Sequence, residues 1–511
     1  MSGEQDSASY ERLGAKRLGI VDVIAQSVGF MGPVFSVAFV IPLVIGVVSA
    51  SGKGGGAASP LSVLIAGVGI LSLGWIISRY ARRVHAAGSL YDYVSRGLGS
   101  RAGVAAGWLY YMGVIVLTAA LLLLLGGYLQ STILTNFKVD PLPPWAWTLL
   151  LTAGLFLVLY FGVRISTRAQ LALAGISVIV VLGFFIMVMV KLGSANSVAP
   201  FKPSSSVDGW SGIFFGVLYG VLMFTGFETA ANLAEETPKP HRHVPIAVLA
   251  SAGIATLWFV LATYVEVAGF HYNLKSISAA ATAPLFALGA PATAGGYGGT
   301  WIDRLLELVV LFDMMAVGIG CAVSASRGIF AMARDRRIPA PLASVSKRHG
   351  TPFGASFFVI GAVVVSVLLD QFAPSLFALP KTPHYFALFS WGATFGGFAL
   401  VVVYLLVAVG SIRSFARARG RLLLYLAALL GIAITGGAIF GSFYKVTNPT
   451  LYAPEFALIW LALGVVVAFA TKGRDPASMH LADLAAGPDG AHVESRTKVA
   501  SAAAEPLLQH D

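Results

Sequence analysis

The stretch Gly29-Phe30-Met31-Gly32-Pro33 lies near the middle of an apolar segment that covers about residues 22–49. Two glycines and a proline so close together are strong helix breakers, so we expect a helix to split at this point. In a bilayer, unwound backbone survives only where protein groups or a water-filled cavity satisfy its polar atoms. If this segment crosses a membrane, its break therefore lies inside a bundle of helices.

The composition of the whole chain indicates a membrane protein. Of the 511 residues, 57% are hydrophobic and 11% are charged, whereas charged residues make up about a quarter of soluble globular proteins. Twelve spans of roughly 20 apolar residues would use on the order of 240 residues and leave short loops and two tails. The apolar runs are too long for barrel strands of about 10 alternating residues. We therefore predict an all-α integral membrane protein with twelve transmembrane helices.

The apolar windows and the positive charges together predict the topology. The windows cover about 22–49, 59–80, 102–130, 144–163, 169–190, 210–236, 244–270, 303–333, 353–370, 384–410, 421–441 and 455–471. Twelve spans place both termini on one side, and 26 of the 34 Lys and Arg residues fall in the segments of that side. Because cytoplasmic loops are enriched in Lys and Arg, we expect a multi-pass protein of the cell membrane with cytoplasmic termini. This topology accounts for the net charge of +11 without a nucleic-acid partner.

We expect one transmembrane domain over residues 20–471, between cytoplasmic tails at 1–19 and 472–511. The C-terminal tail is polar, Ala-rich and free of aromatic residues, as is typical of disordered segments. The single cysteine, Cys321, excludes an intrachain disulfide. His241 and His243 lie in a polar loop without metal-ligand spacing. We expect neither a metal nor a cofactor.

A second interruption, Phe224-Thr225-Gly226-Phe227-Glu228, lies in the sixth window. The first and sixth windows each begin a block of five, which is typical of an inverted repeat of five plus five helices. The two repeats would cover about 20–192 and 208–412, with two extra helices at 421–471, and both breaks would meet at the bilayer midplane. For either motif alone, the alternative is that its glycines serve only close helix packing.

Together the two breaks predict a clamp for a zwitterion. The half-helix that begins at Pro33 points the amides of Val34 and Phe35 at the cavity, where a carboxylate would bind. Pro33 suits the first helical position because an amide hydrogen there would be unpaired anyway. The carbonyl groups near Gly29 and Thr225 suit an ammonium group.

Four acidic residues fall inside or near the ends of the spans, and at roughly 3 kcal/mol each on insertion scales they would be costly if they faced lipid. They are Glu228, Glu266, Glu307 and Asp313. We expect Glu228, beside the second break, to carry a proton, hold a gate or bind a cationic group. Asp313 either lines the outer vestibule or only pairs with Arg304 or a helix dipole. Glu266 and Glu307 are expected near the outer interface.

Several motifs resemble those of the amino acid/polyamine/organocation permeases. The run from Phe224 to Thr237 and the loop that follows it, 238–245, are similar to the sixth-helix signature of that family. Further similar landmarks are Gly88-Ser89-Leu90-Tyr91-Asp92-Tyr93, Gly107-Trp108, and the stretch 327–339. The resemblance covers roughly residues 20–470. It implies the LeuT-type fold with broken helices 1 and 6, secondary active transport, and a substrate held between the breaks.

The resemblance also implies a set of substrate-binding positions. These are Phe30, Gly32, Pro33 and Val34 at the first break, Leu222, Thr225, Gly226 and Phe227 at the second, Gly113, Val114 and Thr118 in the third helix, and Cys321 in the eighth. Gly29, Phe35 and Phe224 join the set because they flank the breaks. Glu228 matches the sixth-helix acid of the family, and Ser177 takes the place of a fifth-helix lysine found in some proton-coupled members. Glu228, Ser177 and Asp313 are therefore the candidates for gating or proton coupling.

Two features of the motifs bear on the substrate. Pro33 stands where many members offer a small residue with an available amide, so carboxylate capture must use fewer or different amides. Leu222 stands at the position of an aromatic residue that stacks on a guanidinium in arginine exchangers, which weakens that interpretation. Arg327 lies toward the inner end of the eighth window, where we expect its long side chain to snorkel.

We predict a transporter that moves amino acids or related amines by alternating access, with a proton or a sodium ion as coupling ion. A transporter of a non-amino-acid solute is the alternative that Pro33 favours. A cation channel is disfavoured because the sequence contains no repeated filter. An enzyme is disfavoured because the spans contain no HExxH pair, no paired Asp motif and no nucleophile with a neighbouring His.

Overall fold

The computed structural model describes residues 18–47, 54–280, 284–378, 382–415, 421–444 and 446–471. Apart from residues 18 and 19, the two predicted tails lie outside these described residues. Within them the regular structure is helical, with one isolated bridge between Pro291 and Gly298 and no strand. The prediction of an all-helical protein is confirmed.

Among the described residues, eleven helical segments are long and apolar enough to cross a membrane. The first is the interrupted segment Ile20–Ile45. The other ten each overlap one long helix: α4 (Ser59–Ala81), α6 (Ser100–Phe137), α7 (Pro144–Phe161), α8 (Val163–Leu192), α10 (Pro240–Gly269), α13 (Thr300–Arg334), α14 (Phe353–Phe372), α15 (His384–Ser414), α16 (Arg421–Phe443) and α17 (Tyr452–Ala470). The sixth predicted window contains a shorter apolar helix, α9 (Gly209–Met223). Short helices α5 (Leu90–Leu98), α11 (Leu274–Ala280) and α12 (Pro284–Gly289) lie in the connections.

The first span is broken where the sequence predicts. Helix α1 (Ile20–Met31) ends at Gly32, whose φ of 57° lies in the left-handed region that only glycine adopts at little cost. Pro33 then begins α2 (Pro33–Phe35), which continues without a gap through the π-helical turn η1 (Ser36–Val40) into α3 (Ile41–Ile45). The glycine therefore ends one half-helix and the proline starts the next.

The sixth window is also interrupted. Helix α9 ends at Met223, residues 224–228 form turns, and the chain continues as the 3₁₀ helix η6 (Thr229–Glu236). Gly226 has a φ of 110°, which again requires glycine. The predicted second break is therefore present.

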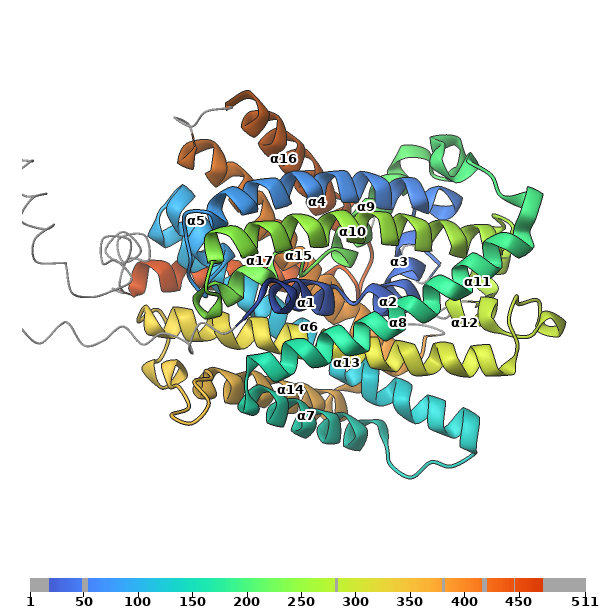
Figure 1. Ribbon diagram of the computed structural model, residues 1–511, viewed down its shortest axis with the longest axis horizontal. Coiled ribbons are helices and arrows are strands. Elements are labelled where there is room, and N and C mark those ends of the chain that lie inside the picture. Colours follow the sequence, from blue (N-terminus) through green and yellow to red (C-terminus); the bar gives the residue numbers. More distant parts are fainter. Residues whose placement is uncertain are drawn as a thin grey trace, which may run out of the picture.

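The first span lies at the centre of the bundle. Of its most apolar stretch, 94% is buried, compared with 22% for α7. The most extensive contacts join α6 to α15, α4 to α10, and α13 to α8, and these helices surround α1 in Figure 1. The break near Gly32 is thus enclosed by protein, as unwound backbone in a membrane requires.

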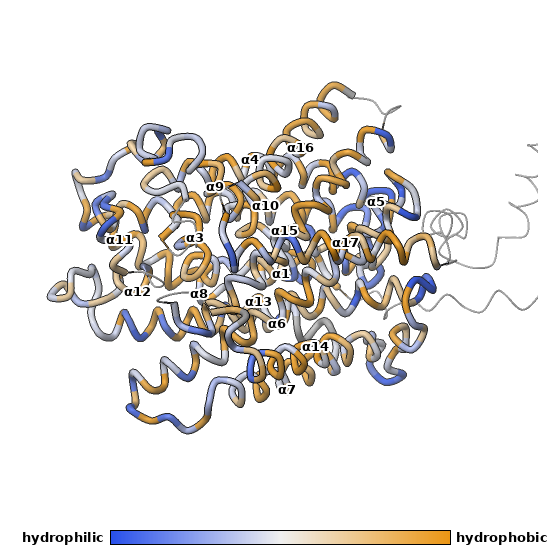
Figure 2. The backbone as a smooth tube through the Cα atoms, turned by 180° about the vertical axis from the view of Figure 1, so that it is seen from behind, coloured by the Kyte–Doolittle hydropathy of each residue, from blue (hydrophilic) through white to orange (hydrophobic). Residues whose placement is uncertain are grey.

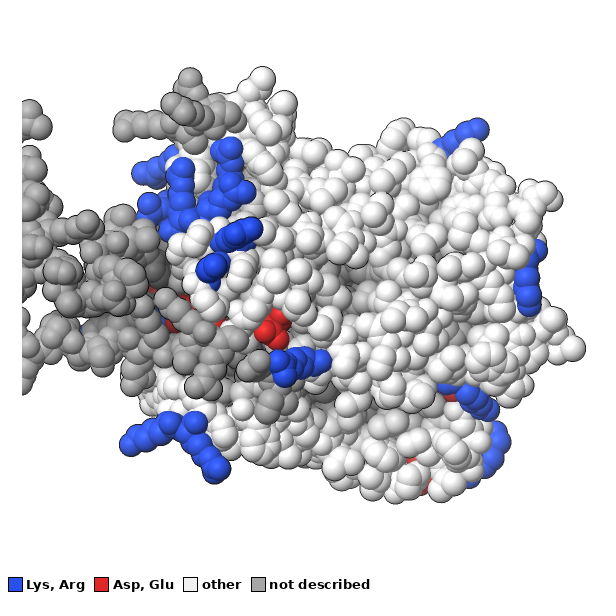
Figure 3. All heavy atoms as spheres, in the orientation of Figure 1, with Lys and Arg blue, Asp and Glu red and all other residues white. Residues whose placement is uncertain are grey.

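The outside of the bundle suits a lipid environment. Large apolar side chains are exposed along the outer helices, including Ile179 and Val190 on α8 and Phe372 on α14. Figure 2 shows apolar residues along the middle of the helices and hydrophilic ones toward the two ends of the molecule. On the face seen in Figure 3, the Lys and Arg side chains leave an uncharged band between those ends. This distribution is the one expected of a membrane-spanning bundle.

Candidate functional site

The two interrupted helices touch each other at their breaks. Gly226 lies directly against the ring of Phe30, so that a Cβ atom on Gly226 would collide with it. The hydroxyl of Ser27 donates a hydrogen bond of 2.9 Å to the carbonyl oxygen of Phe227 and accepts one of 3.0 Å from the amide of Ala230. The unwound backbone of one break is therefore satisfied by a side chain next to the other.

Helix α13 lies along the first break. Gly320 packs against the backbone of Phe30, and the side chain of Val317 packs against Gly32. The side-chain amide of Gln26 donates a 3.0 Å hydrogen bond to the carbonyl oxygen of Gly320. The breaks and α13 thus form one packed unit in which glycines allow close approach.

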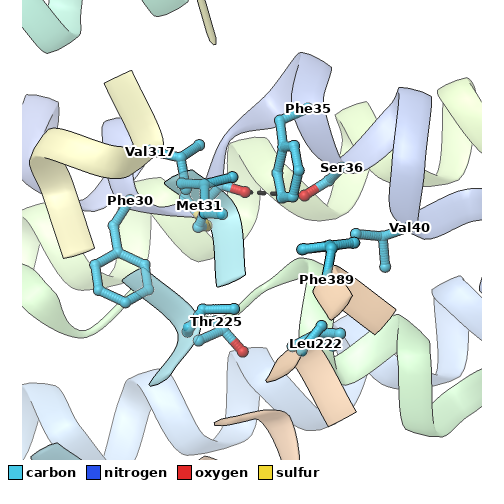
Figure 4. Close-up of a pocket in the computed structure, with 12 residues that line it drawn as sticks. Phe30, Met31, Phe35, Ser36, Val40, Leu222, Thr225, Val317 and Phe389 are labelled. Carbon is cyan, nitrogen blue, oxygen red and sulfur yellow. Dashed lines mark hydrogen bonds between the residues drawn. The ribbon is translucent and has the colours of Figure 1, made fainter. Parts of the chain in front are cut away.

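A small cavity lies between the two breaks. Its volume of about 20 Å³ holds about one water molecule. It is lined by Phe30, Met31, Phe35, Ser36, Val40, Leu117, Leu121, Leu222, Thr225, Val317, Phe389 and Ala393. Figure 4 shows the two polar side chains of this set, those of Ser36 and Thr225, among apolar ones, with Ser36 donating to the carbonyl oxygen of Met31 at 2.9 Å. The cavity therefore suits an apolar body with few hydrogen-bonding groups.

The amides predicted for a substrate carboxylate are already engaged. Oδ2 of Asp313, on α13, accepts hydrogen bonds from the amides of Val34 at 2.8 Å and Phe35 at 2.6 Å. Asp313 therefore interacts with a helix dipole, at the amino terminus of the half-helix that begins at Pro33. It does not pair with Arg304, which pairs with Glu307 at 3.3 Å. The carboxylate suits this place because the helix dipole and the free amides favour negative charge.

The other predicted acid joins the second break to two more helices. Glu228 is fully buried and accepts hydrogen bonds from the hydroxyls of Tyr110, on α6, at 2.9 Å and Tyr404, on α15, at 2.8 Å. Its second oxygen also accepts from the amide of Gly226 at 3.2 Å. Glu228 does not line the cavity. Its hydrogen bonds connect the second break to α6 and α15.

Four of the predicted substrate-binding residues line the cavity, namely Phe30, Phe35, Leu222 and Thr225. The other predicted residues of the two breaks lie around the cavity. Gly29 packs against Gln170, the carbonyl oxygen of Pro33 accepts a hydrogen bond of 2.9 Å from the indole of Trp258, and Phe224 packs edge-on against Phe259. The remaining four form the buried backbone of the breaks, namely Gly32, Val34, Gly226 and Phe227. The structure therefore brings residues of both breaks together at one cavity.

The predicted residues of the third, fifth and eighth helices lie outside the cavity lining. Gly113 packs against Ala399 on α15, and Val114 is buried and accepts a 2.7 Å hydrogen bond from the hydroxyl of Thr118. Cys321 is buried beside Gly320. Ser177 donates to the carbonyl oxygen of Val309 on α13 at 2.7 Å.

Sequence reasoning missed cavity residues on α6 and α13. In α6 the cavity residues are Leu117 and Leu121, one turn apart, whereas the prediction chose Thr118. In α13 the cavity residue is Val317, one turn before the predicted Cys321. Residues four apart share a helix face, so Leu117 and Leu121 lie on the face of the predicted Gly113, and Val317 lies on the face of Cys321. Nothing in an all-round apolar helix indicates which of its turns reaches the cavity.

Glu266 lies three residues before the end of α10 and is fully buried, and neither carboxyl oxygen has a hydrogen-bond partner among the described residues. One expectation about charged residues is wrong. Arg327, expected to snorkel, is buried and pairs with Glu236 at 2.7 Å. After the interruption of the sixth span, η6 packs against α1, α10 and α13, and Glu236 at its end reaches this arginine.

A second ion pair lies beside the first. Both terminal nitrogens of Arg334 contact the carboxylate of Glu235, at 3.0 and 2.9 Å, and this carboxylate also accepts a hydrogen bond of 3.0 Å from the amide of Ala87. The side chains of Arg334 and Glu235 are 5% and 7% exposed, so water screens the pair little. Together the two ion pairs fasten η6 to α13.

Comparison with known proteins gives a consistent family. The amino acid permease family model matches residues 30–477. The chain is 22% identical over 358 residues to the branched-chain amino acid permease BcaP of Bacillus subtilis. The matched region covers 64% of this chain and 71% of that protein. The chain is 23% identical over 432 residues to the gamma-aminobutyric acid permease of Escherichia coli (80% and 86% covered) and 22% identical over 328 residues to the methylthioribose transporter of Bacillus subtilis (61% and 67% covered). The chain therefore belongs to the amino acid permease family, within the APC superfamily.

Proposed function

We propose that this protein is a secondary active transporter that moves amino acids or related amines across the cell membrane by alternating access. The observation that carries the proposal is the meeting of two interrupted helices around one cavity inside the bundle. Broken helices at a shared cavity are the usual binding site of transporters built from inverted repeats. The relatives that transport branched-chain amino acids and gamma-aminobutyrate support the same class of solute.

The contacts around the cavity supply elements that would have to move. On one side, η6 is held to α13 by the pairs Arg327–Glu236 and Arg334–Glu235. On the other, the segment beginning at Pro33 is held by Asp313 and by the indole of Trp258. Because the cavity holds about one water molecule, a solute requires at least one of these sides to open. Alternate release of the two sides is the motion that we propose.

Coupling and orientation follow from the same proposal. We assign Glu228 to gating or proton coupling, because it is buried and holds the second break through Tyr110 and Tyr404. The Lys and Arg distribution supports cytoplasmic termini. The five-plus-five arrangement of residues 20–412, with two extra helices, is part of this proposal.

A non-amino-acid solute is the second candidate. It is favoured by the engagement of the Val34 and Phe35 amides with Asp313, and a methylthioribose transporter is among the relatives.

Uptake into proteoliposomes distinguishes these candidates. The purified chain should accumulate radiolabelled amino acids or amines when a proton or sodium gradient is applied, and dissipation of the gradient should abolish accumulation. A panel of sugars and thioethers without an amino group tests the second candidate. Absence of gradient-sensitive uptake or exchange for every solute would contradict the proposed transport. Single-channel currents would show that the protein is a channel instead.

A further inference from the structure

Asp313 occupies the place where a substrate carboxylate is expected. Its Oδ2 accepts from both free amides at the start of the helical segment Pro33–Ile45, at 2.8 and 2.6 Å. One of these donors belongs to Phe35, which lines the cavity, and Asp313 lies one helical turn from Val317, which lines it too. The protein thus supplies its own carboxylate at the edge of the cavity.

This carboxylate is held in place by the packing of α13. One turn and two turns further along the same face, Val317 packs against Gly32 and Gly320 packs against the backbone of Phe30. Gln26 adds a hydrogen bond to the carbonyl oxygen of Gly320. Withdrawal of Asp313 would therefore require α13 to separate from the first break, and it would leave two buried amides without acceptors.

Among the described residues, no cationic side chain forms an ion pair with Asp313. Its other oxygen, Oδ1, is buried and has no hydrogen-bond partner. Among the described residues, the groups that donate hydrogen bonds to this carboxylate are the two amides of Val34 and Phe35. The neighbouring side chains from α8 and α10 are neutral: Ser177 donates to Val309, and Trp258 donates to Pro33. A buried charge of this kind is stabilised when a cation binds beside it.

Once one side of the cavity opens, the rest of its lining suits the apolar part of such a cation. Ten of its twelve lining residues are apolar, and its polar side chains are the hydroxyls of Ser36 and Thr225. A zwitterionic amino acid would bring a second carboxylate toward Asp313 after both amides have been used. Like charges in a dry site repel strongly.

We propose that Asp313 determines which solutes bind by taking the place of a substrate carboxylate, an inference that rests on the proposed function as a transporter. The preferred substrate is then an organic amine without a carboxylate, with an apolar alkyl or aromatic body in the cavity and its ammonium group beside Oδ1 of Asp313.

Binding to the purified full-length protein, measured by calorimetry with matched solutes, tests this proposal. The solutes are L-leucine and 3-methylbutylamine, and L-phenylalanine and 2-phenylethylamine, in which each amine lacks only the carboxylate of its partner. The wild-type protein should bind each amine at least tenfold more tightly than the amino acid. Uptake of the same four solutes into proteoliposomes shows whether transport follows binding.

Two variants isolate the charge from the hydrogen bonds. Asp313→Asn keeps an acceptor for the amides but removes the charge, so amine affinity should fall at least tenfold without a gain for the amino acid. Asp313→Ala frees both amides, so the ratio of amino acid to amine affinity should rise at least tenfold. If the alanine variant does not fold, the asparagine variant alone decides. Glu307→Gln, on the same helix and away from the break, is the matched control and should leave all affinities unchanged.

The outcomes separate the two proposals. Tighter binding and faster uptake of the amino acids by the wild-type protein would overturn the role of Asp313 but leave transport intact. That result would instead indicate that the Asp313 carboxylate moves away from the amides of Val34 and Phe35 when the carboxylate of a substrate binds there. Equal loss of both solute classes in Asp313→Asn would also overturn it. Absence of binding and uptake for every solute would overturn the proposed function, and this inference with it.

Discussion

The hydroxyl of Ser27 donates a 2.9 Å hydrogen bond to the carbonyl oxygen of Phe227, and so joins a helix before the first break to the unwound backbone of the second. The Ser27 hydroxyl also accepts a hydrogen bond of 3.0 Å from the amide of Ala230. Two segments about 200 positions apart in the chain thereby share one buried hydroxyl. This contact ties the two breaks to each other.

Replacement of Ser27 by Ala should loosen this junction. It leaves two buried backbone groups without a partner, which costs about 1–3 kcal/mol per group at most. We expect a lower melting temperature of the purified protein and slower uptake. Ser366→Ala is the control, because the Ser366 hydroxyl bonds only to Ala362 in its own helix. Equal melting temperatures for the two variants would show that the junction contributes nothing.

Replacement of Glu228 by Gln should change transport without preventing insertion. Glutamine has nearly the same shape as glutamate, but it cannot gain or lose a proton. It also replaces one of the two carboxyl oxygens that accept hydrogen bonds from Tyr110 and Tyr404 by an amide nitrogen. We expect altered pH dependence or loss of turnover, measured as initial uptake rates over a pH series. Tyr404→Phe keeps the carboxylate and removes one hydrogen bond, which is worth about 1.5–3 kcal/mol for a charged acceptor. It should lower stability and leave the shape of the pH profile unchanged. An unaltered profile in Glu228→Gln would remove this residue from the mechanism.

Replacement of Arg327 by Ala should destabilise the protein strongly. It leaves Glu236 buried without its partner, and removing one member of a buried pair costs about 3–5 kcal/mol. The matched control is Arg304→Ala in the pair with Glu307, whose arginine side chain is 42% exposed, and such pairs contribute under about 1 kcal/mol. Chemical denaturation of both variants in the same detergent measures the difference. Similar losses in the two variants would contradict a fastening role for Arg327.

Replacement of Glu266 by Met should raise stability. The carboxyl group of Glu266 is fully buried and both of its oxygens lack partners among the described residues, so its removal relieves a penalty of about 1–3 kcal/mol. Glu307→Met is the comparison, since Glu307 accepts a hydrogen bond from Asn136 at 2.6 Å and pairs with Arg304. A drop in the melting temperature of Glu266→Met would reveal a partner that Glu266 needs.

The breaks were predictable because their causes are local. Gly32 and Pro33 end and restart a helix through their own backbone preferences, and Gly226 adopts a φ that other residues avoid. Length and hydrophobicity likewise predicted the helical bundle. These properties belong to short stretches of chain and need no knowledge of neighbours.

The occupant of the first break was not predictable in the same way. Asp313 reaches the amides of Val34 and Phe35 across about 280 positions of sequence, and this depends on how α13 packs against α1. The tyrosines that hold Glu228 come from two other helices for the same reason. Helices that are apolar on all sides carry no pattern that fixes their rotation.

The most direct test of the account is whether a transported solute shields the second break. In a Cys321→Ala background, Thr225→Cys places a single thiol at the cavity, and Ser366→Cys places one outside it as a control. The account predicts that a solute which the protein takes up slows alkylation of the thiol at position 225 by N-ethylmaleimide and leaves that at position 366 unchanged. Alkylation of position 225 at an unchanged rate in the presence of a saturating transported solute would contradict a substrate site between the two breaks.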